Sequence, residues 1–74
     1  MKKQDIINNL GITTPFSINE ISSAITMLTD FYNMSEKDAL KSIKGIINVA
    51  MAYGKSLHQT IILMLGDKNG SISY

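Results

Sequence analysis

The longest helical pattern of the chain lies in residues 35–56, SEKDALKSIKGIINVAMAYGKS. Ser35 precedes the first apolar residues, and the acidic residues Glu36 and Asp38 follow it, which is typical of a helix N-terminus. Gly54 comes after the last apolar residue, and glycine readily adopts the left-handed conformation that ends a helix. Ser56 then begins another pattern of the same kind. The segment predicts a helix over residues 36–53 and a short connection to a second helix.

Apolar side chains cover roughly 200° of the circumference of the predicted 36–53 helix, counted at 100° per residue. They are Ala39, Leu40, Ile43, Ile46, Ile47, Val49, Ala50, Met51 and Tyr53. A helix with so wide an apolar face is expected to contact neighbours on two sides. Its remaining face gathers the lysines Lys37, Lys41 and Lys44 within roughly 60°.

Two further serines predict where neighbouring helices begin. Ser17 and Glu20 have the spacing of a capping box, in which the serine hydroxyl accepts the Glu20 amide and the glutamate reaches back to the serine amide. The residues that follow are amphipathic and predict a helix over residues 18–33. Ser56 and Gln59 repeat the spacing and predict a helix over residues 57–65.

A short helix over residues 4–10 is expected to precede these three. Gly11 is expected to cap it in the left-handed conformation, with Ile12 folding back onto Ile7 as in a Schellman ending. Pro15 disfavours helical geometry at Thr14, so an extended connection should follow.

The last predicted helix ends in five consecutive apolar residues, Ile61–Leu65. On a helix these leave almost no polar side, so the segment should be buried or lie at a subunit interface. A rival interpretation makes 61–65 a strand, paired with 72–74 through a turn at 66–70. We favour the helix because an isolated hairpin is only marginally stable. Residues 66–74 then form a turn and a tail.

The predicted helices together indicate an all-α fold, a small three- to four-helix bundle within one domain of residues 1–74. A chain of 74 residues without cysteine has a small core and no disulfide to support it. The usual remaining support is a second chain, so we expect a homodimer through the third and fourth helices. The longest apolar run, Ile61–Leu65, is far too short to cross a bilayer, and no signal-peptide core follows Met1. We therefore expect a cytoplasmic protein without a membrane partner.

Residues that could carry catalysis or bind a metal are few. His58 is the single histidine, and Asp67, at an uninformative spacing, is the only nearby candidate for a second metal ligand. The five glycines are scattered and form no phosphate-binding loop. The sequence therefore predicts no catalytic residue, no cofactor and no metal site, and we expect that the protein is not an enzyme.

Protein interaction is the favoured function, as a small regulator or adaptor of the kind that phages and other mobile elements encode. The surplus of apolar helix surface motivates it. The candidate interface comprises Met27, Phe31, Met34, Leu57, Ile61, Ile62 and Leu65.

The alternative function is a nucleic-acid-binding regulator that uses the lysine face of Lys37, Lys41 and Lys44. A net charge of +1 provides no general attraction to nucleic acid, so such binding would depend on local clustering. A helix-turn-helix within residues 6–25 is disfavoured, because its second helix would contain neither lysine nor arginine.

Overall fold

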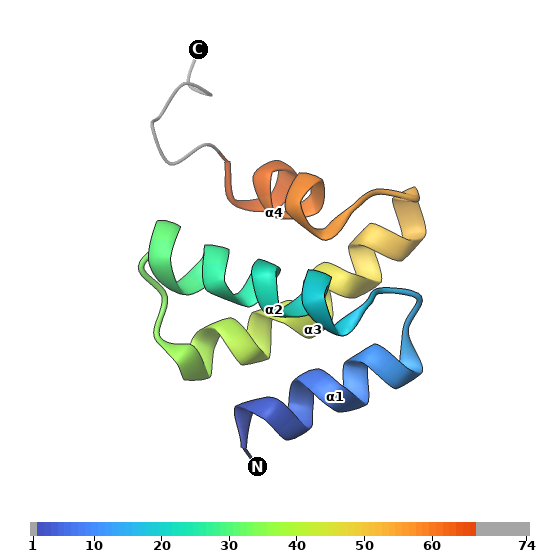
Figure 1. Cartoon of the computed structure of the whole chain (residues 1–74). Coiled ribbons are helices and arrows are strands. Elements are labelled where there is room, and N and C mark those ends of the chain that lie inside the picture. The colour runs from blue at the N-terminus through green and yellow to red at the C-terminus, as the bar shows by residue number, and fades with distance from the viewer. Residues whose placement is uncertain (1, 67–74) are drawn as a thin grey trace.

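The computed structural model describes residues 2–66, which form four α-helices and no strand. The helices are α1 (Lys3–Thr13), α2 (Ile18–Thr26), α3 (Glu36–Tyr53) and α4 (Leu57–Leu65), and a π-helical segment η1 (Met27–Phe31) continues α2. Figure 1 shows α2 and α3 in the middle of the molecule, with α1 and α4 on opposite sides of them. The all-α prediction is confirmed.

The three serine caps form as predicted. The hydroxyls of Ser17, Ser35 and Ser56 accept hydrogen bonds from the amides three residues later, at 3.0, 3.1 and 3.1 Å. Each bond satisfies an amide that would otherwise lack a helical partner. Gly54 ends α3 with φ 65°, the left-handed cap that its position predicts. The helices α3 and α4 consequently have the predicted bounds, and the strand interpretation of 61–65 is wrong.

The first helix differs from the prediction, because it continues past Gly11 to Thr13. The amide and the hydroxyl of Thr14 both donate to the Leu10 carbonyl, so the helical bonding runs on until Pro15. Ile12 is 83 % exposed and does not fold back onto Ile7. Both parts of the predicted Schellman ending are therefore wrong.

Gly11 has a packing role instead of a capping role. A methyl group built on its Cα would lie 2.6 Å from Cγ1 of Ile18, which is shorter than a normal contact between carbon atoms. The absence of a side chain therefore lets the end of α1 approach the start of α2 closely.

The predicted 18–33 helix is confirmed over most of its length, but it changes to π geometry at Met27. A hydrogen bond in a π-helix spans five residues instead of four, so the side chains after Met27 are displaced around the helix axis relative to a regular α-helix. Tyr32 packs against the core, while Phe31 is 41 % exposed. Asn33 then ends the segment with φ 59°, a conformation that asparagine tolerates better than most residues.

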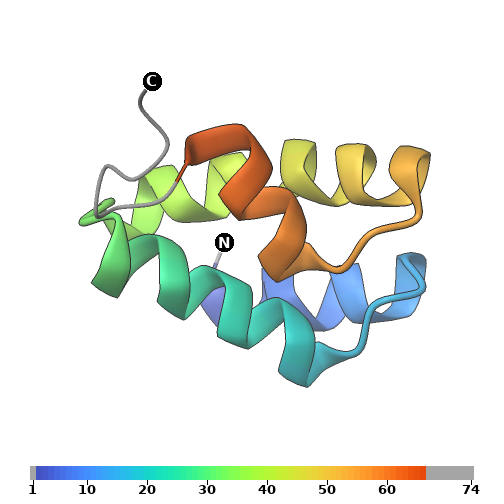
Figure 2. The same ribbon diagram turned by 90° about the horizontal axis from the view of Figure 1, so that it is seen from above.

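The core between the helices is aliphatic. It consists of Ile7, Ile21, Ala24, Ile25, Leu28, Ala39, Ile43, Ile46, Ile47, Ala50, Leu57 and Ile61. Figure 2 shows α4 lying across α2 and α3, while α1 runs beneath. Among residues 2–66, no helix combines the length and the apolar character needed to cross a bilayer. Residues 67–74, where most of the predicted turn and tail lie, are outside the part of the chain that the structure describes.

Candidate interaction surfaces

The last turn of α4 exposes four consecutive apolar side chains. Ile62, Leu63, Met64 and Leu65 are 42–64 % exposed, whereas Leu57 and Ile61 earlier in the helix are fully buried. The helix thus begins as part of the core and ends as an apolar surface. We call Ile62, Leu63, Met64 and Leu65 the α4 patch.

Tyr32 connects Phe31 to the residue that follows α4. The hydroxyl of Tyr32 donates a hydrogen bond to the carbonyl of Gly66, the residue that follows α4. The rings of Phe31 and Tyr32 meet edge to face with their centroids 5.1 Å apart. The exposed ring of Phe31 is therefore linked to the C-terminal end of α4 through Tyr32.

The predicted interface residues divide into three groups. Leu57 and Ile61 are core residues, so their assignment to an interface is wrong: they lie on the side of α4 that packs against the other helices. Met27 and Met34 are half-buried and pack against the core. Phe31, Ile62 and Leu65 are exposed. Leu63 and Met64 were not in the predicted set, although they belong to the same uninterrupted apolar run.

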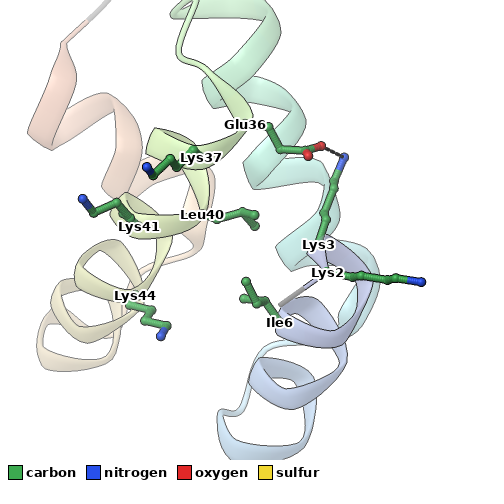
Figure 3. A pocket seen from close by; sticks show the side chains of 8 residues that line it. All are labelled: Lys2, Lys3, Ile6, Glu36, Lys37, Leu40, Lys41 and Lys44. Atoms are coloured by element: carbon green, nitrogen blue, oxygen red, sulfur yellow. Dashed lines mark ion pairs between the residues drawn. The ribbon is translucent and has the colours of Figure 1, made fainter.

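The second surface is a groove between α1 and the first half of α3 (Figure 3). Its volume is about 800 Å³, and its lining residues are Lys2, Lys3, Ile6, Glu36, Lys37, Leu40, Lys41 and Lys44. The side chains of Ile6 and Leu40 point toward one another between the two helices. A smaller hollow of about 150 Å³ shares Ile6 and Lys44 with the groove and extends along α1 to Asn9 and Leu10.

We call this groove the basic groove, because positively charged side chains predominate among its lining residues. Five of the seven lysines of the chain line it, against one acidic residue, Glu36. The carboxylate of Glu36 pairs with the ammonium of Lys3 across the groove at 3.4 Å. Both side chains are substantially exposed, so this ion pair contributes little to stability.

The predicted lysine face forms one side of the basic groove. Lys37, Lys41 and Lys44 are exposed on α3, as their spacing predicts. The fold adds Lys3 of α1 and Lys2, the residue before this helix. The positions of these two groups of lysines along the chain did not predict that they would meet. The adjacent residues Ile6 and Ile7 were the available signal in the sequence, because neighbouring residues lie on different sides of a helix. In the structure Ile7 is buried and Ile6 is half-buried.

A third feature connects α2 to α4 through a carboxylate. Oε2 of Glu20 accepts a hydrogen bond from the amide of Leu57 at 3.2 Å. The Glu20 carboxylate was expected to accept a hydrogen bond from the Ser17 amide. It lies instead at the N-terminus of α4, where its negative charge interacts favourably with the helix dipole. Ser56 forms the complete capping box of the structure with Gln59.

His58 is exposed in the first turn of α4. Within residues 2–66, no group of three or more histidine, aspartate or glutamate side chains is placed to hold a metal ion. Every buried side-chain nitrogen or oxygen atom in that range has a hydrogen-bond partner.

Comparison with known protein families, curated proteins and solved structures gives no match for this chain. The function proposed below therefore rests on the chemistry of the two surfaces.

Proposed function

We propose that this protein is a small, non-enzymatic protein-interaction module that forms a homodimer through the α4 patch. The observation that carries the proposal is the exposure of Ile62, Leu63, Met64 and Leu65, four apolar residues in succession at the end of a helix. Contiguous apolar surface of this kind is typical of contact sites between proteins. The role is that of a cytoplasmic regulator or adaptor.

The size of the α4 patch supports a weak, reversible dimer. Burying a large apolar side chain completely is worth about 2 kcal/mol, so completing the burial of a half-exposed one is worth about 1 kcal/mol. The α4 patch and Phe31 together then contribute about 5 kcal/mol per copy, or about 10 kcal/mol per dimer. Association costs at least about 4 kcal/mol. The remainder is at most about 6 kcal/mol, which corresponds to a Kd of tens of micromolar or weaker.

Sedimentation velocity over a concentration series tests this proposal with a matched pair of variants. Ile62→Asp places a charge in the α4 patch, and Ile12→Asp places the same charge at another exposed isoleucine near a helix C-terminus. We expect the wild type and Ile12→Asp to associate with the same Kd, whereas Ile62→Asp should weaken association more than about tenfold.

Circular dichroism establishes that both variants keep their helices before sedimentation is interpreted. A wild-type chain that sediments as an 8.2 kDa monomer at millimolar concentration would refute the dimer. Equal weakening by Ile12→Asp and Ile62→Asp would refute the α4 patch as its location.

Nucleic-acid binding is the second candidate function, and the gathering of five lysines at the basic groove is the observation in its favour. The chain contains no arginine for bidentate phosphate contacts, and no aromatic residue lines the groove for base stacking. Titration with mixed DNA and RNA at low salt tests it. Binding that falls steeply with salt and is lost in Lys41→Glu would promote this candidate above the first.

A further inference from the structure

The basic groove combines two kinds of surface that call for different partner groups. Its floor is aliphatic, because Ile6 and Leu40 face one another between α1 and α3 (Figure 3). Its edges carry lysine side chains from both sides, and Glu36 is the only acidic lining residue among residues 2–66. A ligand that complements the groove therefore needs apolar groups flanked by negative charge.

The lysine spacing on α3 matches a helical ligand. Lys37, Lys41 and Lys44 follow one another at i, i+4 and i+7, which spans about 10 Å of helix rise. Carboxylates at the same spacing on a partner helix would lie along them. The apolar face of that helix would contact Ile6 and Leu40. Lys2 and Lys3 line the other edge of the groove, where Lys3 pairs with Glu36.

A nucleic acid fits the basic groove less well than such a helix. The floor offers isoleucine and leucine, which do not stack on bases as aromatic rings do. A phosphate backbone would leave this aliphatic floor without a complementary surface, whereas leucine or isoleucine side chains of a protein would cover it.

A second copy of this chain is also a poor occupant. The acidic residues within the described range are Asp5, Glu20, Asp30, Glu36 and Asp38, and they are spread over α1, α2, η1 and α3. No described helix presents an acidic edge at the spacing of the α3 lysines, and Glu20 already accepts a hydrogen bond from Leu57. The partner must therefore be a different protein.

We propose that the basic groove binds an acidic amphipathic helix of a second protein. This site is separate from the α4 patch, since α1 and α4 lie on opposite sides of α2 and α3 (Figure 1). The inference does not depend on the homodimer: the basic groove is complete within one copy of the chain.

Fluorescence anisotropy with a model peptide tests the inference on the full chain. The probe is a labelled helical peptide of about four turns, with glutamates at i, i+4 and i+7 on both edges of a leucine face. We expect saturable binding that weakens as salt is raised, because the contacting charges are exposed and screened. The same peptide with glutamine in place of glutamate should bind at least about fivefold more weakly.

Matched variants of the protein locate the site. Lys41→Glu, inside the groove, should weaken peptide binding about fivefold, whereas Lys55→Glu, outside it, should leave binding unchanged. Ile6→Ser should weaken binding by removing half of the apolar floor. Glu36→Gln should strengthen binding about twofold, because it removes the one negative charge from the lining and frees Lys3 from its ion pair.

Three results would overturn the inference. The first is an absence of peptide binding at millimolar protein. The second is equal weakening by Lys41→Glu and Lys55→Glu. The third is tighter binding of a single-stranded oligothymidine probe that is unaffected by Ile6→Ser, which would assign the basic groove to nucleic acid instead.

Discussion

Glu20 makes a contact between helices whose strength can be measured. Its carboxylate accepts the amide of Leu57, the first residue of α4, and Leu57 is itself fully buried. A hydrogen bond to a charged group contributes about 1.5–3 kcal/mol, and a negative charge at a helix N-terminus contributes about 0.3–1 kcal/mol. Because Glu20 is only half-buried, we take values near the lower ends of these ranges.

We expect Glu20→Ala to lower the free energy of unfolding by about 2 kcal/mol, since it removes both the hydrogen bond and the charge. Glu20→Gln keeps an oxygen acceptor but removes the charge, so it should cost about 1 kcal/mol. Urea denaturation followed by circular dichroism measures both values. For a domain of this size, 1 kcal/mol corresponds to a shift in Tm of about 4–8 °C.

Glu36→Gln is the matched control, because Glu36 is also a glutamate in the first turn of a helix. Its side chain is exposed and pairs with Lys3, so its neutralisation should cost less than about 0.5 kcal/mol. If the two glutamine variants lose equal stability, the contact between Glu20 and Leu57 does not hold α4 in place.

Four further substitutions test the packing account by the same denaturation assay. Gly45→Ala should stabilise the protein by about 0.5–1 kcal/mol, since nothing lies within 4 Å of the added methyl group. Gly11→Ala should destabilise the protein by up to about 1 kcal/mol, because the added methyl group would contact Ile18. A gain at both glycines would contradict the close approach of α1 to α2. Gly54→Ala should cost about 1 kcal/mol, because φ is 65° at the end of α3; an unchanged stability would mean that the cap relaxes. Ile43→Ala should cost about 3 kcal/mol by opening a cavity in the core, and a cost below 1 kcal/mol would place Ile43 outside it.

Local signals predicted most of the helical structure. Ser35 and Ser56 mark where α3 and α4 begin and Gly54 marks where α3 ends, because capping depends on a few neighbouring atoms that the sequence identifies directly. Gly11 has the same residue type as Gly54 but a different role. Its role depends on Ile18 in the next helix, and such a contact between elements leaves no local pattern.

The candidate surfaces were predictable only in part, for the same reason. The apolar run of 61–65 indicated that α4 has more apolar residues than one buried face can hold. Which of them face the core depends on how α4 lies across α2 and α3. Leu57 and Ile61 face inward, and Ile62 and Leu65 do not. The lysine face of α3 was predictable from the spacing of its residues. The position of Lys2 and Lys3 at the basic groove depends instead on how α1 packs.

Methyl NMR over a dilution series tests the proposed dimer most directly, because it reports the contact at each side chain separately. As the protein is diluted from millimolar to micromolar concentration, we expect the methyl shifts of Ile62 and Leu65 to change along one binding curve. The methyl shifts of Ile12, which is exposed at the end of α1, should stay constant. Shifts of Ile62 and Leu65 that do not change with concentration would contradict the claim that the α4 patch is where this protein associates.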